Sequence, residues 1–218
     1  FLAIDSVHGV EIRDGNANWY GNRYVMNRAF QDQEADVMTS LRDMTRSSAN
    51  THVIHHAGKI MALEEGHWPF VVSDELETIG PHNYDGKLKG SMTAHPKTCS
   101  ETGELISFGY GMTEPYLTYH RTSASGELLQ VEDITVKAAT MIHDFNITRN
   151  HVIFMDLPAL WNLEGMATTG LPILWDESYG ARLGVMPRDG TDADVTWYEI
   201  NPCYVFHQIG TASCRERV

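Results

Sequence analysis

Residues 51–63 read THVIHHAGKIMAL, and this stretch indicates the fold class. Two short runs rich in β-branched and apolar residues, 51–54 and 59–63, flank the turn His56-Ala57-Gly58. Short apolar runs on either side of a glycine-containing turn are typical of a β-hairpin. The stretch therefore predicts two antiparallel strands joined by a short turn.

The same strand–turn rhythm recurs along the chain, at intervals of about eight to twelve residues. Runs rich in Val, Ile, Thr and aromatic residues predict further strands at 105–110, 116–120, 128–131, 151–156 and 195–200. Helical patterns are thin: 31–46 is expected to be a loop or a short helix, and 161–169 a short helix or an ordered insertion. The pattern predicts an all-β protein, as a sandwich, barrel or propeller, with residues 1–218 in a single domain.

Composition limits the kinds of binding partner and the cellular location that we expect for the chain. The chain has 218 residues and a formal net charge of -13, which argues against a nucleic-acid partner because phosphate-binding surfaces need clustered Lys and Arg. The three cysteines, Cys99, Cys203 and Cys214, are too few and too scattered for a disulfide framework or a thiolate zinc site. We therefore expect a reducing, cytoplasmic location.

Three of the eleven histidines share a context that suits metal binding. His95, His143 and His207 each follow a small or apolar residue at the edge of an expected strand. Their wide separation excludes a local metal finger and fits ligands contributed singly by successive repeats of a large β structure. Neutral imidazoles are good ligands of iron, zinc or copper. Spacing alone nevertheless favours incidental histidines over a metal site.

The other histidines lie in turns or beside charged neighbours. They are expected to be surface or hydrogen-bonded core residues: His8, His52, His55, His56, His67, His82, His120 and His151. Other chemistries have weaker support, because the sequence has no nucleophile elbow, Walker loop or dinucleotide-binding glycine motif. A three-histidine zinc hydrolase stays an alternative on ligand count.

A series of short motifs resembles the carotenoid cleavage oxygenase family, which is related to the lignostilbene dioxygenases. The motifs occur in family order over nearly the whole chain, which makes the resemblance specific where one motif would be weak. They are VHGV at 7–10, WYGNRY at 19–24, ANTHVI at 49–54, LEE at 63–65, LETIG at 76–80, TAHPK at 93–97, TGEL at 102–105, HDFNIT at 143–148, PRDG at 187–190 and FH at 206–207.

The resemblance implies a seven-bladed β-propeller with a cap of loops and short helices, in which four histidines hold an axial Fe(II). By motif, His95, His143 and His207 match three of these ligands. Glu65 matches a carboxylate that accepts a hydrogen bond from the free ring N–H of a ligand imidazole. The implied reaction is cleavage of a carbon–carbon double bond of a carotenoid, an apocarotenoid or a stilbene by O₂. The implied partners are an apolar polyene and O₂, with membrane contact limited to transient substrate uptake.

The chain also departs from the family pattern. The fourth histidine and the C-terminal blades belong to a part of the family sequence beyond Phe206-His207, so we expect a fragment, and an inactive fragment is an alternative function. Residues 208–218 form a tail that does not follow the family continuation. Glu64 stands where stilbene-cleaving relatives tend to carry Lys, which favours a carotenoid or apocarotenoid substrate.

Overall fold

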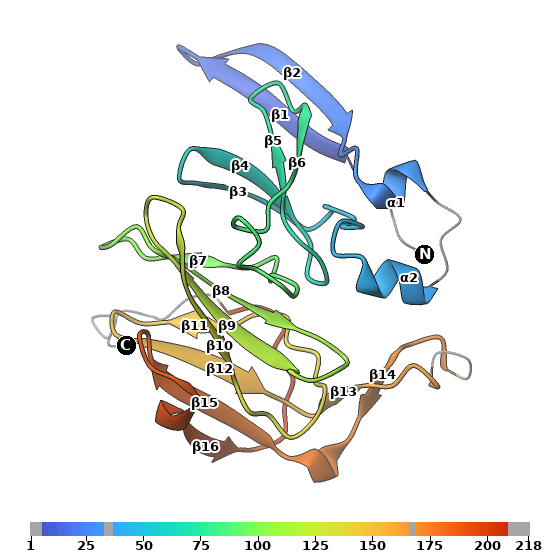
Figure 1. Cartoon of the computed structure of the whole chain (residues 1–218), viewed down its shortest axis with the longest axis vertical. Helices are drawn as coiled ribbons and strands as arrows, with labels where there is room; N and C mark the ends of the chain where they lie inside the picture. The colour runs from blue at the N-terminus through green and yellow to red at the C-terminus, as the bar shows by residue number, and fades with distance from the viewer. Residues whose placement is uncertain (1–5, 33–36, 166–168, 209–218) are drawn as a thin grey trace. The chain divides into compact units, whose positions relative to one another are not determined.

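The computed structural model of the chain describes residues 6–32, 37–165 and 169–208 (Figure 1). These residues group into two compact units. The first unit comprises residues 1–94 and 123–128, and the second comprises 95–122 and 129–218. A single domain over the whole chain stays a prediction. Among the described helices, none is long and apolar enough to cross a membrane.

The first unit combines a hairpin, a four-stranded sheet and two short helices. The hairpin is β1 (Ser6–Arg13) with β2 (Asn16–Tyr24), and the helices are α1 (Arg28–Gln31) and α2 (Val37–Arg42). The antiparallel sheet has the order β3 (His52–His56), β4 (Lys59–Leu63), β5 (Phe70–Val72) and β6 (Thr78–Pro81). Helix α2 confirms the expected short helix within 31–46.

The predicted hairpin at 51–63 is confirmed as β3–β4, with His56 paired to Lys59 across the turn. Ala57 and Gly58 both have positive φ angles, 48° and 74°. Two-residue hairpin turns that match the twist of the strands need this conformation, and glycine adopts it without strain. The strand–turn rhythm does not predict β1 and β2, because most of their side chains are exposed and no apolar face marks the alternation.

Strand β4 is covered on both faces, as expected for a central strand of a packed sheet. Met61 and Leu63 belong to one apolar cluster, which includes Ala94. Ala62, between them in sequence, belongs to a second cluster with Phe70. Successive side chains of a strand point to opposite faces, so the continuous apolar run at 60–63 reflects burial on both sides.

The second unit contains two four-stranded antiparallel sheets and a hairpin. The first sheet has the order β10 (Leu128–Asp133), β9 (Leu117–Thr122), β8 (Leu105–Tyr110) and β7 (Lys97–Thr98). The second has the order β11 (Asn146–Ile147), β12 (His151–Asp156), β15 (Ala181–Pro187) and β16 (Thr196–Ile200). The hairpin is β13 (Ala159–Trp161) with β14 (Ile173–Trp175), and the 3₁₀ helices are η1 (Glu177–Tyr179) and η2 (Asp192–Asp194).

The predicted strands of this unit are confirmed, two of them with the predicted bounds, at 105–110 and 151–156. The segment expected to be a short helix or an insertion at 161–169 starts at the last residue of β13 and continues into the loop between β13 and β14. Residues 166–168 lie outside the described part of the chain. Strand β15 is absent from the sequence-based prediction, because Gly184 interrupts its apolar run.

One apolar core joins the two sheets of the second unit. Phe108 of β8 and Tyr119 of β9 share it with Phe154 of β12, and all three are fully buried. The Tyr119 and Phe154 rings meet edge to face, with centroids 5.9 Å apart. Face-to-face packing of four-stranded antiparallel sheets around such a core is the arrangement of neighbouring propeller blades.

Gly184 of β15 lies directly opposite Trp197 of β16 and leaves room for its indole ring. A Cβ added at position 184 would approach the ring to 2.6 Å. The ring is held in place because the Arg182 guanidinium stacks on it at 3.9 Å and also pairs with Asp156 at 2.7 Å.

We expect Gly184→Ala to lower the free energy of unfolding in urea by about 1–3 kcal/mol, because the indole must shift within a packed sheet. The matched control is Gly90→Ala, whose added Cβ meets nothing within 4 Å. The control is expected to change the same free energy by less than about 0.5 kcal/mol. Equal losses in the two variants would show that the Trp197 ring does not require the glycine.

Candidate metal centre

The three histidines singled out by their context lie in loops of the second unit. His95 comes just before β7, His143 lies in the segment before β11, and His207 lies in the segment after β16. His143 is buried, His95 is half-buried and His207 is exposed. The three histidines therefore come from three separate segments of the chain, and not from a shared local motif.

The structure brings these three imidazoles together. Their ring centroids are 4.6 Å apart for His95 and His143, 4.7 Å for His143 and His207, and 4.8 Å for His95 and His207. One ring nitrogen of each lies within 4.8 Å of one ring nitrogen of each of the others. Within residues 6–32, 37–165 and 169–208, no other group of His, Cys, Asp or Glu side chains is close enough to hold a metal ion.

Apolar packing of the residues before His207 positions it beside the other two imidazoles. The preceding residues Cys203, Tyr204 and Val205 pack against a buried cluster that includes Met155 of β12. The next ring, Phe206, meets His143 edge to face with centroids 4.9 Å apart. The segment after β16 is thus held against the second sheet up to the ligand itself.

A buried carboxylate lies beside the imidazoles. Asp144 accepts hydrogen bonds from the Lys97 ammonium at 2.6 Å, and from the backbone N–H groups of Phe145 and Gln208 at 2.8 Å each. Burial alone would raise the pKa of Asp144, but the bonds from Gln208 and Lys97 outweigh it and lower the pKa. Asp144 is therefore ionised at neutral pH.

Two of the imidazoles are held in the neutral form. Burial, together with the nearby His143, lowers the pKa of His95 from 6.5 to about 4. Burial and the nearby His207 likewise lower the pKa of His143. A neutral imidazole has the lone pair that a metal ligand must donate, so both residues are in the binding form at neutral pH.

The donor set fits a divalent transition metal. Three imidazoles at nearly equal separations supply borderline nitrogen donors, which suit Fe(II), Zn(II) or Cu(II), and they leave other coordination positions open. They add no negative charge, so a bound ion would keep its full charge toward an exogenous ligand. The donor set alone suits iron and zinc alike.

The two glutamates after β4 differ in what the structure shows of them. Glu65, half-buried in the first unit, was expected to support a ligand imidazole, and that role stays a prediction. Glu64 accepts hydrogen bonds from the ring of His67 and from the Gly66 backbone N–H, the latter at 2.9 Å. Glu64 is therefore engaged in its own unit.

Of the remaining histidines, His56, His67 and His120 are buried. His67 fits the expected hydrogen-bonded core type, because Glu64 and the Ser40 carbonyl, at 2.7 Å, accept from its ring. Burial would lower the pKa of His67, but the Glu64 carboxylate, together with the Ser40 carbonyl and Asp43, outweighs burial and raises the pKa. His120 corrects the expectation, because it is 2% exposed and its Nδ1 has no hydrogen-bond partner among the described residues.

Burial lowers the pKa of His120 from 6.5 to about 4. Between pH 6.5 and about pH 4, His120 binds a proton in the unfolded chain but not in the folded chain, so the free energy of unfolding falls as the pH falls. We expect acidification from pH 7 to pH 5 to cost the wild type about 2 kcal/mol more, in urea unfolding, than it costs His120→Leu. The exposed His151 gives the matched control: His151→Leu should keep the full acid loss, and an unchanged loss in His120→Leu would contradict the prediction.

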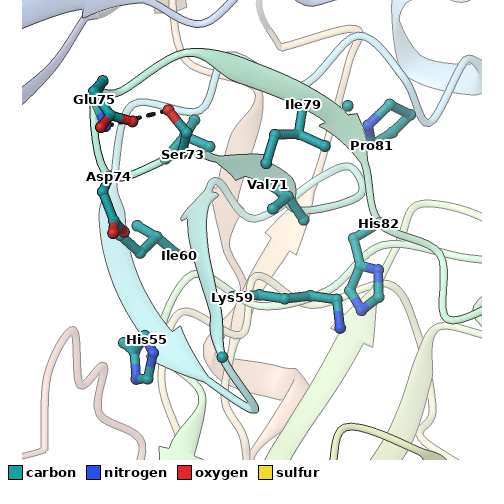
Figure 2. A pocket seen from close by; sticks show the side chains of 13 residues that line it. His55, Lys59, Ile60, Val71, Ser73, Asp74, Glu75, Ile79, Pro81 and His82 are labelled. Carbon is teal, nitrogen blue, oxygen red and sulfur yellow. Dashed lines mark hydrogen bonds between the residues drawn. The ribbon is translucent and has the colours of Figure 1, made fainter.

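A hollow of about 740 Å³ lies in the first unit, and none of the three imidazoles lines it (Figure 2). Its lining includes His55, Lys59, Asp74 and His82 (Figure 2). Burial, reinforced by the Lys59 charge, lowers the pKa of His82. In the described part of the chain, these side chains form no metal-binding group, so the hollow offers no second metal centre.

Comparison with known proteins identifies the family of the chain. Residues 5–212 match the family described as RPE65, retinal pigment epithelial membrane protein. The chain is 33% identical to a carotenoid cleavage oxygenase of Mycobacterium tuberculosis, over 99% of this chain and 52% of the relative. It is 35% identical to a carotenoid 9,10(9′,10′)-cleavage dioxygenase of Crocus sativus, over 92% of this chain and 43% of the relative. The chain thus spans about half the length of the curated relatives it matches.

Solved structures share the fold. Lignostilbene dioxygenase of Pseudomonas brassicacearum matches with a TM-score of 0.71 and 32% identity, over 83% of this chain and 41% of that one. A cobalt-substituted Synechocystis apocarotenoid oxygenase matches in fold with a TM-score of 0.67 at 21% identity, over 86% of this chain and 45% of that one. The predicted β-propeller class is confirmed, with the chain forming part of such a propeller. The chain belongs to the RPE65 and carotenoid cleavage oxygenase family, to which the lignostilbene dioxygenases are related.

Proposed function

We propose that the chain carries three ligands of the non-haem Fe(II) centre of a dioxygenase that cleaves a carbon–carbon double bond of a carotenoid or apocarotenoid. The observation that carries the proposal is the grouping of His95, His143 and His207 in a chain whose matched relatives are carotenoid cleavage enzymes. The motif series favours iron over zinc, which the donor set alone does not separate.

The residues of the chain have distinct parts in this proposal. His143 is the buried ligand, and the exposed His207 is the ligand that solvent reaches. The Phe206 ring packs edge to face on the His143 ring and supports that imidazole. When bound, ferrous iron supplies the redox chemistry that activates dioxygen.

The proposed reaction balances without a further reductant. The carbon–carbon double bond breaks, and each of its two carbons gains one atom of the same O₂ molecule. The products are two carbonyl compounds, and dioxygen is the oxidant. No protein nucleophile or general acid is required, so the contribution of the chain is to hold the metal and to orient the polyene.

Glu64 supports a carotenoid or apocarotenoid substrate over a stilbene. A lysine at this position could hold a phenolate by its charge, whereas a carboxylate repels one. The Glu64 carboxylate is also engaged by His67. Stilbene cleavage is the second candidate, favoured by the 32% identity to the Pseudomonas lignostilbene dioxygenase.

An inactive fragment that binds metal or an apolar ligand is a third candidate, because the chain spans about half the length of its curated relatives. The proposal also includes a reducing, cytoplasmic location. In the described part of the chain, Cys99 and Cys203 are free thiols, which agrees with such a compartment.

The test is an O₂-dependent cleavage assay. The chain is first loaded with Fe(II) under anaerobic conditions, and O₂ is then supplied with the substrate. An apocarotenal and a hydroxystilbene are supplied in separate reactions, and products are followed by mass spectrometry together with O₂ uptake. We expect two carbonyl products from the apocarotenal and one O₂ consumed per double bond. Products from the stilbene alone would favour the second candidate, and iron binding without any cleavage would favour the inactive fragment.

A further inference from the structure

Asp144 is bonded to all three segments that carry the histidines. It directly follows His143, and its side chain is 2% exposed. One of its donors, Lys97, lies two residues after His95, and another, the Gln208 N–H, directly follows His207. A single buried carboxylate thus joins three segments that are far apart in sequence.

We propose that Asp144 is a positioning residue that keeps the three imidazoles in the mutual arrangement needed for metal binding. The inference rests on the proposed metal centre, and it adds a residue to which neither the motif series nor the donor set gives a role. Asp144 acts through its neighbours: it fixes the backbone on either side of the ligand set, and the imidazoles follow.

The chemistry of the contacts requires a carboxylate. Oδ1 accepts from Lys97 and from the Phe145 N–H, while Oδ2 accepts from the Gln208 N–H. An ionised carboxylate has two acceptor oxygens and can satisfy all three donors. Asparagine has one acceptor oxygen, and its NH₂ group would face an N–H or ammonium donor. The bonds therefore select Asp over its uncharged isostere.

The Asp144 carboxylate is anchored to the core of the second unit. The next residue, Phe145, is fully buried in the core that joins the two sheets, and its ring meets Phe108 edge to face with centroids 5.1 Å apart. The Lys97 ammonium lies 5.8 Å from the centroid of the same Phe145 ring. The bonds to Lys97 and Gln208 thus tie two surface segments to a rigid part of the fold.

His207 depends on this anchor more than the other two imidazoles do. Its side chain is exposed, so less packing surrounds its ring than surrounds the buried His143. The Gln208 N–H bond to Asp144 fixes the backbone directly after it, at 2.8 Å. Because the donor is a backbone group, any residue except proline at position 208 can make the bond, and the departure from the family sequence there does not remove it.

The experiment compares Asp144→Asn with Asp156→Asn in the 218-residue chain. Asp156 is a matched control: it is fully buried in the same unit and accepts from Arg182 and Tyr179 at 2.7 Å each. Both variants lose a buried ion pair, so both are expected to lose stability. Only Asp144 is bonded to the segments that carry the imidazoles.

The first readout is the NMR signals of the histidine rings in the metal-free protein. We expect Asp144→Asn to shift or broaden the ring signals of His95, His143 and His207 together, and Asp156→Asn to leave them unchanged. The second readout is the affinity for Co²⁺, measured by titration. Asp144→Asn is expected to raise the Kd for Co²⁺ by about 10–100-fold, the range found for groups that orient metal ligands, and Asp156→Asn by less than about 2-fold.

The two readouts separate the positioning role from the metal centre. Ring signals that change in His143 alone, or equally in both variants, would overturn the positioning role. A wild-type chain that binds no Co²⁺ would count against the proposed metal centre, while the ring signals would still decide the role of Asp144. If Asp144→Asn does not fold, Lys97→Met replaces it, and it must then shift the His95 signals for the inference to stand.

Discussion

Replacement of His143 by alanine is expected to weaken Fe(II) binding by at least about 100-fold, the upper end of the effect of losing a group that merely orients a ligand. His143 is the most buried of the three imidazoles, and its ring is 4.6 Å from His95 and 4.7 Å from His207, centroid to centroid. Its removal leaves two donors, one of them on an exposed segment. A competition titration against a chromophoric chelator under anaerobic conditions measures the change.

The control for this prediction is His151→Ala. His151 begins β12 in the same unit and is exposed, so its loss should leave the Fe(II) affinity unchanged. Circular dichroism of both variants checks that the β structure persists. An affinity that stays at the wild-type value in His143→Ala would remove His143 from the ligand set.

Replacement of Phe154 by alanine is expected to lower the free energy of unfolding by about 3–5 kcal/mol. The Phe154 ring is fully buried between the two sheets of the second unit, where it packs edge to face on Tyr119. Its loss leaves a cavity in the core to which both sheets contribute. The total stability of a domain is about 5–15 kcal/mol, so the variant should be close to unfolding at room temperature.

Urea unfolding monitored by tryptophan fluorescence measures this loss. The matched control is Tyr198→Ala in β16, where the aromatic ring is 55% exposed. The control is expected to cost less than about 1 kcal/mol, because little buried surface is removed. Equal losses in Phe154→Ala and Tyr198→Ala would contradict the assignment of a shared core between the sheets.

Strand positions could be predicted where a strand presents an apolar face or an aromatic run. The turn at Ala57-Gly58 and the runs at 105–110 and 151–156 carry this signal in full. Strands β1 and β2 could not be predicted because most of their side chains are exposed. Strand β15 could not be predicted because Gly184 interrupts its apolar pattern, and the glycine is needed to leave space for Trp197 on another strand. Such a requirement is tertiary, so no local pattern contains it.

The imidazoles of the site could be predicted from the sequence around them, but their surroundings could not. A shared context at expected strand edges grouped His95, His143 and His207, and the resemblance then gave them a role as metal ligands. Asp144 stands inside the HDFNIT motif, and its place directly after a ligand was the one local signal for it. Its bonds to Lys97 and Gln208 join residues far apart in the chain, which no sequence spacing indicates.

All three imidazoles and Asp144 lie in the second compact unit. The geometry of the ligand set is therefore internal to one unit and can be examined in the chain itself. The activity of the longer relatives is a separate question, addressed by the cleavage assay.

The measurement that tests the central claim most directly is X-ray absorption at the iron edge of the chain loaded with Fe(II). The account predicts the outer-shell scattering of three imidazoles per iron, with the remaining positions filled by light oxygen donors. Loss of one imidazole from that pattern in His143→Ala would identify the ligand. A wild-type spectrum with oxygen donors alone, and no imidazole scattering, would contradict the account.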